Sequence, residues 1–140
     1  AVSALDLSVR AQVLNLLEDL KAKHGLSYLF ITHDIGVVQH IADRIAVMYL
    51  GKIVETGPAD RVLQSPAHPY TQLLMRAVPR IGVPLPEETA PAEAVTASGA
   101  HGCPFAPRCP LAEAACLAHP PVLRPLDTAD HLCACVKARV

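Results

Sequence analysis

All five cysteines of the 140-residue sequence lie in its last 38 residues, and the first 102 residues contain none. An even spread would not produce this grouping, so the C-terminal segment has a chemistry of its own. In a chain outside an oxidising compartment, such a group is more often a metal site than a set of disulfides. We therefore expect residues 101–140 to form a small cysteine-rich, metal-binding extension. Its cysteines are Cys103, Cys109, Cys116, Cys133 and Cys135.

The composition fits a folded protein, because 51% of the residues are hydrophobic. The net charge of −1 gives no electrostatic reason to expect nucleic acid or an anionic membrane surface as a partner. No apolar run approaches the roughly 18 residues that cross a bilayer, and the first residues show no leader pattern. We expect a soluble, cytosolic chain that reaches a membrane only through partners. Since it opens on Ala1 without an initiator methionine, we also expect a piece of a longer protein.

The first third of the chain alternates between helical and strand patterns. Apolar residues recur about every 3.6 positions over 9–23, which predicts a helix. Asp6 or Ser8 would cap its start, and Gly25 would end it. Residues 27–32 are apolar and β-favouring, which is typical of a buried strand.

The pattern continues to residue 78 with short elements separated by glycine and proline. We expect a helix over 34–42, hairpin strands over 44–50 and 52–56 with a turn at Gly51, and helices over 59–64 and 70–77. This alternation predicts an α/β fold whose strands are parallel and flanked by helices. From 79 to 100 prolines stand among Ala, Glu, Thr and Ser without apolar periodicity, which indicates a linker between residues 1–78 and the extension at 101–140.

Two short runs flank the first predicted helix and strand: Ser-Ala-Leu-Asp before them and Thr-His-Asp after them. Residues 1–78 resemble the C-terminal part of the P-loop ATPase domain of ABC transporters, in which these runs are the D-loop and the switch-histidine loop. The resemblance implies that Asp6 couples two ATPase subunits and that His33 reaches the γ-phosphate of ATP. Placing a histidine at the end of a strand suits phosphoryl transfer, which depends on positioning and charge stabilisation. Ser3, Ala4 and Leu5 would form the rest of the D-loop at the subunit interface.

A plainer interpretation is that His33 only caps the helix that begins beside Asp34. The sequence contains no G-x-x-x-x-G-K-[ST] phosphate loop, signature motif or Walker B carboxylates. Backbone N–H groups and the lysine of such a loop hold the phosphates, so ATP and Mg²⁺ would bind only in a full-length parent. We therefore expect this chain alone to hydrolyse no ATP.

Two further runs narrow the resemblance to importers of oligopeptides, dipeptides and nickel. Residues 65–71 read Ser-Pro-Ala-His-Pro-Tyr-Thr, and residues 102–110 read Gly-Cys-Pro-Phe-Ala-Pro-Arg-Cys-Pro. Such a protein is an energy-coupling ATP-binding subunit on the cytoplasmic side of the inner membrane. Its partners would be a second ATPase subunit, transmembrane permease subunits and a solute-binding protein. We expect His68 to cap a helix rather than to bind metal.

Four thiolates are the usual ligands of a [4Fe–4S] cluster, and the resemblance associates one with this extension. Cys103, Cys109 and Cys116 supply three. The fourth is Cys133 or Cys135, and the family's H-x-x-x-C ending favours Cys135 because His131 precedes it at that spacing. Structural zinc is an alternative, although its usual close Cys pairs are absent. The runner-up function is accordingly an iron–sulfur or zinc-binding module on an ATPase-derived scaffold.

Overall fold

The computed structural model of the chain describes residues 7–78 and 101–138. The chain divides into an N-terminal unit, residues 1–43, and a C-terminal unit, residues 44–140. The linker predicted over 79–100 and the D-loop run at 3–6 both lie outside the described residues.

Over residues 7–43 the regular structure of the N-terminal unit is two helices, α1 (Leu7–His24) and α2 (Ile35–Ile41), and both confirm predicted helices. Gly25 follows α1 with φ at +63°, a left-handed conformation that glycine adopts without strain. Ser8 lies inside α1, so it is not the N-cap, and Asp6 lies outside the described residues. Asp34 caps α2, because its Oδ1 accepts from the backbone N–H groups of Gly36 and Val37.

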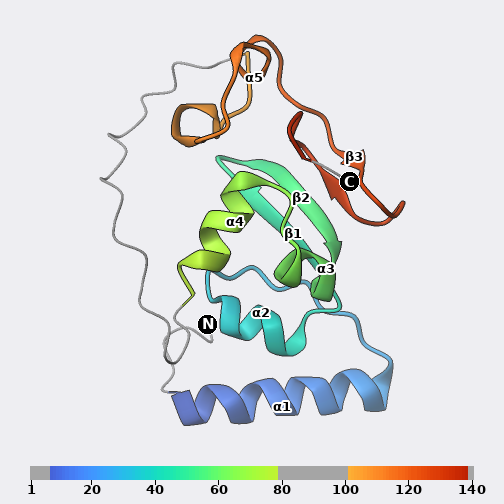
Figure 1. Ribbon diagram of the computed structural model, residues 1–140. Coiled ribbons are helices and arrows are strands. Elements are labelled where there is room, and N and C mark those ends of the chain that lie inside the picture. Colours follow the sequence, from blue (N-terminus) through green and yellow to red (C-terminus); the bar gives the residue numbers. More distant parts are fainter. Residues whose placement is uncertain (1–6, 79–100, 139–140) are drawn as a thin grey trace. The chain divides into compact units, whose positions relative to one another are not determined.

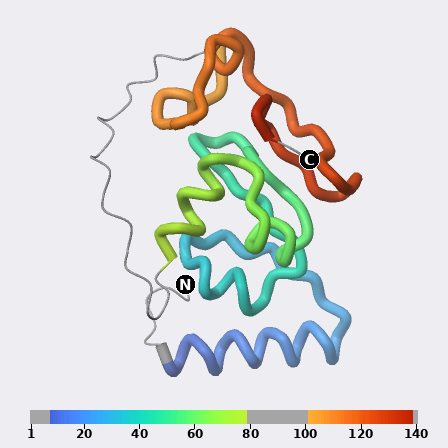
Figure 2. Tube along the Cα trace, in the orientation of Figure 1, coloured from blue at the N-terminus to red at the C-terminus, as the bar shows by residue number. Residues whose placement is uncertain are grey.

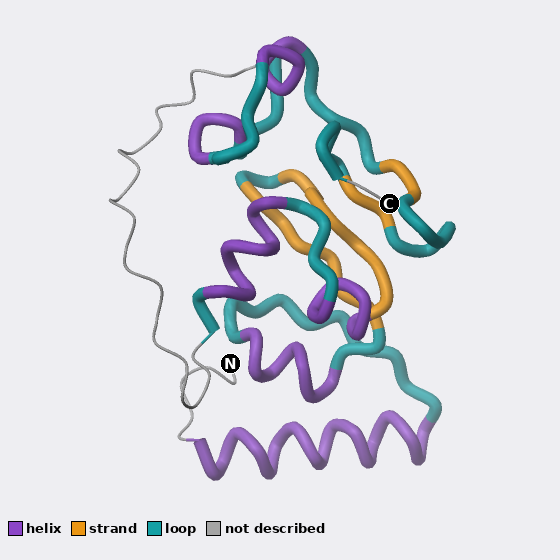
Figure 3. Tube along the Cα trace, in the orientation of Figure 1, coloured by secondary structure: helices purple, strands orange, loops and turns teal. Residues whose placement is uncertain are grey.

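The strand predicted over 27–32 is wrong, since this segment carries no strand and runs as a loop (Figure 3). The side chains of Leu29 and Ile31 are 90% and 94% exposed. A buried strand needs neighbours that satisfy its backbone and cover its side chains, and the described residues of this unit supply no neighbouring strand. The small core of the unit comes from the two helices, with Leu14, Val37 and Ile41 buried and with Leu17 and Phe30 packed against them.

The C-terminal unit begins with the predicted hairpin, β1 (Arg44–Tyr49) and β2 (Lys52–Pro58). Its turn uses left-handed backbone at Leu50 and Gly51, with φ at 44° and 76°. Helices α3 (Ala59–Gln64) and α4 (Pro69–Arg76) follow as predicted. Val47, Val54 and Val62 form the buried core beneath them, and Ile45, Tyr49, Tyr70 and Leu74 pack against it.

The cysteine-rich segment completes the sheet of this unit. It forms the turn η2 (Ala106–Arg108), helix α5 (Ala114–Ala118), and strands β3 (Arg124–Pro125) and β4 (Leu132–Cys133). The strand order is β1-β2-β4-β3, so β2 is paired on both sides (Figures 1 and 2).

Every strand pair in the described part of the chain is antiparallel, so the expected parallel arrangement is wrong. The hairpin turn at Gly51 reverses the chain, and a turn this short joins only antiparallel strands. The fold is therefore α/β with a four-stranded antiparallel sheet, two strands of which come from the extension.

A cysteine-lined pocket and the polar network behind it

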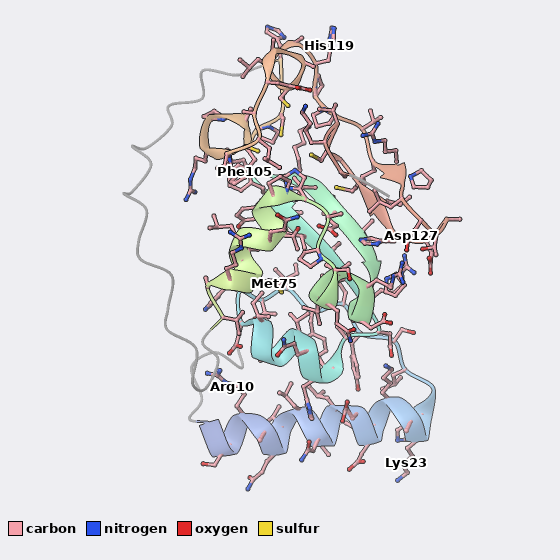
Figure 4. All side chains as sticks on the ribbon, in the orientation of Figure 1. Arg10, Lys23, Met75, Phe105, His119 and Asp127 are labelled. Atoms are coloured by element: carbon pink, nitrogen blue, oxygen red, sulfur yellow. The ribbon has the colours of Figure 1, made fainter. Side chains whose placement is uncertain are left out.

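Four of the five cysteines line one pocket of the C-terminal unit. The pocket holds about 360 Å³ of empty space, counted out to its open mouth. In Figure 4 sulfur atoms gather in the part of this unit near the labelled Phe105. All five cysteines are free thiols. The lining cysteines are Cys103, Cys109, Cys116 and Cys135, and other walls come from His68, Pro69 and Phe105.

Backbone hydrogen bonds draw the first three cysteines together. The N–H of Cys103 donates to the carbonyl of Cys116 at 2.7 Å, and the N–H of Cys109 donates to the carbonyl of Ala106 at 3.1 Å. A Cβ at Gly102 would lie 2.5 Å from the Cys116 carbonyl oxygen, closer than nonbonded atoms approach. Glycine at 102 therefore allows the two ends of this loop to meet.

Cys133 and Cys135 stand in different environments although one residue separates them. Cys133 is fully buried in β4, opposite Glu55 of β2, and does not line the pocket. Cys135 follows β4 and is half-buried on the pocket wall, where the Arg124 guanidinium donates to its carbonyl oxygen at 2.7 Å. Of the two residues considered for the fourth position, Cys135 is the one that the structure brings to the other three.

Burial raises the pKa of the thiols of Cys103 and Cys109, and their neighbouring cysteines raise it further. Burial also raises the pKa of Cys133 well above its usual range. Since the thiolate is the form that binds metal, any metal entering the pocket would have to release protons. Within residues 7–78 and 101–138, no group of three or more His, Cys, Asp or Glu side chains is arranged to hold a metal ion.

A buried carboxylate connects the elements behind the pocket. Glu55 is fully buried, and its oxygens accept from the N–H groups of Ala67 and His68, each at 2.9 Å. The same carboxylate lies 2.9 Å from Nε2 of His131, which is 3% exposed. A carboxylate this deep requires such partners, because leaving it unpaired costs several kcal/mol.

His68 caps α4, as predicted, because its Nδ1 accepts from the N–H of Tyr70 at 3.1 Å. Burial lowers the pKa of His68, and the Glu55 carboxylate partly opposes this effect. The neutral form is the one that can accept the capping hydrogen bond. His68 is thus a structural residue whose ring also forms part of the pocket wall.

Known proteins match most of the chain in sequence. The family model described as "Oligopeptide/dipeptide transporter, C-terminal region" matches residues 54–116. A probable D,D-dipeptide transport ATP-binding protein of Escherichia coli is 51% identical over 117 residues, which are 81% of this chain and 38% of that protein. A dipeptide transport ATP-binding protein of Haemophilus influenzae is 47% identical over 125 residues, 87% of this chain and 38% of the relative. Residues 54–116 thus match the C-terminal region of the oligopeptide/dipeptide transporter family, and most of the chain is similar to ATP-binding proteins of peptide transport.

A probable peptide ABC transporter ATP-binding protein of Sinorhizobium fredii is also similar, with 50% identity over 133 residues, 90% of this chain and 36% of that protein. The chain thus spans less than two fifths of the length of these relatives. The family match runs from Val54 in β2 to Cys116, so it includes three of the four lining cysteines. None of the helices among the described residues is both long and apolar enough to cross a membrane.

The two ATPase residues that the family resemblance singled out lie in the N-terminal unit. His33 is exposed, directly before Asp34, and Asp34 rather than His33 supplies the cap of α2. The Arg10 guanidinium pairs with the Asp34 carboxylate and so connects α1 to the loop that carries His33. Asp6, with Ser3, Ala4 and Leu5, lies outside the described residues.

The Glu55 network is not predicted by the sequence. Glu55 stands in an otherwise ordinary strand pattern, and only its spacing to Cys135 distinguishes His131. The contact joins residues 76 positions apart. One available signal was a carboxylate directly after the buried Val54, within a strand that the sequence already predicts.

Proposed function

We propose that the chain is the C-terminal part of the ATP-binding subunit of an importer for oligopeptides or dipeptides. The match of residues 54–116 to the oligopeptide/dipeptide transporter family carries this proposal, and the names of the similar proteins support the peptide class. In the complete subunit, hydrolysis of Mg²⁺-bound ATP drives solute uptake. The subunit works with a second ATPase subunit, transmembrane permease subunits and a solute-binding protein, on the cytoplasmic face of the inner membrane.

In this proposal His33 is the switch histidine, and the D-loop of Ser3, Ala4, Leu5 and Asp6 lies at the interface between the ATPase subunits. The exposed position of His33 at the end of a loop leaves its imidazole accessible to a nucleotide held by other segments. Since the sequence has no phosphate loop, the 140-residue chain should release no phosphate from ATP. ATP-dependent phosphate release by the purified chain, abolished by His33→Ala, would contradict this.

The transport role is tested in the parent protein. A full-length subunit that includes this chain should restore dipeptide uptake to a strain lacking its own dipeptide ATPase, and His33→Ala should abolish uptake while leaving subunit assembly intact. Uptake that persists in the His33→Ala strain would remove His33 from the mechanism. No uptake of any peptide by the unmodified subunit would count against the peptide class.

We further propose that Cys103, Cys109, Cys116 and Cys135 hold a [4Fe–4S] cluster, with zinc as the alternative. Four thiols around one pocket fit the donor set of such a cluster. Zinc requires four sulfurs at about 2.3 Å from one ion, hence roughly 3.8 Å from one another. A cubane cluster binds each sulfur to a separate iron and so accepts a wider spacing of its four thiolates. When bound, the cluster would supply iron–thiolate cross-links and a redox-active centre.

Metal analysis decides between the two metals. The chain is reconstituted anaerobically with iron and sulfide, or with zinc, and the bound metal and acid-labile sulfide are counted per chain. Cys135→Ala should lose the metal, whereas the matched variant Cys133→Ala should keep it, because Cys133 lies outside the pocket. Equal loss from both variants, or no bound metal in the unmodified chain, would count against this site.

A further inference from the structure

We propose that Glu55 is a positioning residue for the cysteine pocket: its carboxylate holds one wall of the pocket and the strand that delivers Cys135. The inference rests on the proposed metal site. Neither Glu55 nor His131 lines the pocket, so any effect on metal binding acts through the residues that they hold. The carboxylate has three hydrogen-bonding partners, and these come from two separate segments of the chain.

The first segment is the start of α4. By accepting from the N–H groups of Ala67 and His68, Glu55 fixes the backbone that presents His68 and Pro69 to the pocket. Phe105, two residues after Cys103, is 1% exposed and lies against this wall. Its ring centroid is 5.9 Å from that of His68, 5.4 Å from that of Tyr70 and 5.3 Å from that of Tyr49. The wall that Glu55 fixes therefore seats the loop that carries Cys103 and Cys109.

The second segment is the turn before β4. Nε2 of His131 lies 2.9 Å from Oε1 of Glu55, and its Nδ1 lies 3.8 Å from Oδ1 of Asp127. Asp127 also pairs with Arg61 of α3, so the turn is held from two sides. Four residues after His131 comes Cys135, and between them the N–H of Ala134 donates to the carbonyl of Val54 at 2.8 Å. Through His131, Glu55 sets where β4 ends and hence where Cys135 stands.

The close packing around this contact leaves it little freedom. A Cβ at Gly57 would lie 2.9 Å from Cδ2 of His131, so the imidazole rests directly on the backbone of β2. The neutral amide of Glu55→Gln keeps the volume of the side chain, but one of its two ends is an NH₂ donor. That donor would face an N–H group, which leaves at least one buried partner unsatisfied.

The test uses the reconstituted 140-residue chain and measures bound iron and sulfide, the visible absorbance of the cluster, and the rate at which a chelator removes iron. Glu55→Gln should speed iron removal by about 10- to 100-fold, the usual effect of losing an outer support of a metal site. The matched variant is Glu18→Gln, the same change at an exposed position on α1. It should leave the rate unchanged.

A conservative pair at His131 separates positioning from general instability. Glutamine places an N–H where Nε2 of His131 lies, whereas asparagine places one nearer Nδ1. His131→Gln should therefore retain the cluster and His131→Asn should lose it at the rate of Glu55→Gln. This pair also carries the test if Glu55→Gln does not fold.

The outcomes distinguish this inference from the proposed metal site. If the unmodified chain binds iron and both Glu55→Gln and His131→Asn release it at the unmodified rate, Glu55 is not a positioning residue and the site stands. If the unmodified chain binds neither iron nor zinc, the site itself is overturned, and this inference falls with it.

Discussion

The N-terminal and C-terminal units show what a segment gains from having its strand partners within the chain. Residues 27–32 and 52–56 both have strand patterns in the sequence, yet only the second segment forms a strand, β2. The C-terminal strand β2 is paired with β1 on one side and with β4 on the other. The N-terminal segment has no such neighbour among the described residues, and its apolar side chains Leu29 and Ile31 remain exposed.

The burial of large side chains differs between the two units in the same way. The largest fully buried side chains of the described residues all lie in the C-terminal unit: Phe105, His68, Glu55, Val54, Val62, Thr71 and Cys133. Three of these are polar or charged, and two of the three belong to the network that joins the extension to the sheet. Tertiary partners, rather than strand propensity, therefore decide which apolar run becomes regular structure.

The largest expected effect comes from removing the aromatic anchor of the C-terminal unit. Phe105→Ala should lower the free energy of unfolding of this unit by about 3–5 kcal/mol, because the truncation leaves a cavity among Tyr49, His68 and Tyr70. Urea denaturation monitored by tyrosine fluorescence would measure it. Val122→Ala, at a position 76% exposed, is the control and should change it by less than about 0.5 kcal/mol. Equal changes in the free energy of unfolding for the two variants would contradict the expected difference between a buried and an exposed position.

A methyl group at Gly57 should give the next largest effect. It would collide with His131, so Gly57→Ala should cost about 1–3 kcal/mol and separate His131 from Glu55. The matched variant in the N-terminal unit is Gly36→Ala, where the nearest atom is a flexible carboxylate oxygen of Asp34 at 3.2 Å. We expect a change of less than about 1 kcal/mol there, since alanine also favours the helix. Thermal unfolding of both variants makes the comparison, and equal costs would contradict it.

Acid should weaken the C-terminal unit through His68. Burial holds the folded-state pKa of this imidazole below its ordinary value of 6.5. The unfolded chain therefore takes up a proton at a higher pH than the folded chain does. The contribution of neutral His68 to stability is fully present above about pH 6.5, and it declines as the pH falls through that value toward the folded-state pKa.

The free energy of unfolding should fall by about 1 kcal/mol, the usual contribution of a helix N-cap, because imidazolium cannot accept a hydrogen bond from the N–H of Tyr70. His68→Asn keeps an acceptor without a titrating ring, so its stability between pH 7.5 and 5.5 should be flatter. Unfolding midpoints at several pH values measure the difference. Parallel profiles for the two chains would show that another group causes the acid sensitivity.

The smallest effect on stability is expected in the exposed loop of the N-terminal unit. Ile31→Ser should change the free energy of unfolding by less than about 0.5 kcal/mol, because this side chain is 94% exposed. It should instead raise the solubility of the chain by removing an apolar surface residue. A destabilisation comparable with that of Val54→Ser, at a position 2% exposed, would mean that the segment is buried after all.

Much of the local structure followed from the sequence alone. The cap at His68, the glycine that follows α1 and the glycine of the hairpin turn all act within a few residues, so the sequence predicts them without knowledge of the fold. The N-cap of α2 was not predicted, because the sequence pointed to His33 and the structure uses Asp34. The prediction of parallel strands was wrong because the direction of a strand depends on which strand it pairs with. The short strands β3 and β4 have only two residues each, too few to show a pattern.

Part of the candidate site could also be predicted, because it depends on local features of the sequence. A cluster of cysteines is visible in the sequence from residue type alone, and in the structure four of them line one pocket. The support behind the pocket is not visible in this way, because a glutamate and a histidine far apart in the sequence have many possible partners. Their meeting depends on the register of β4 against β2, which pairs Glu55 with Cys133.

The central place of β2 in the sheet has a consequence for where this protein can be divided. Composition suggests a cut in the proline-rich stretch at 79–100, which would leave residues 1–78 as one product. In that product the edge of β2 that pairs with β4 would carry unpaired backbone groups, and Glu55 would lose its contact with His131. Open strand edges recruit other chains, so a protein cut in this stretch should self-associate more than the whole chain.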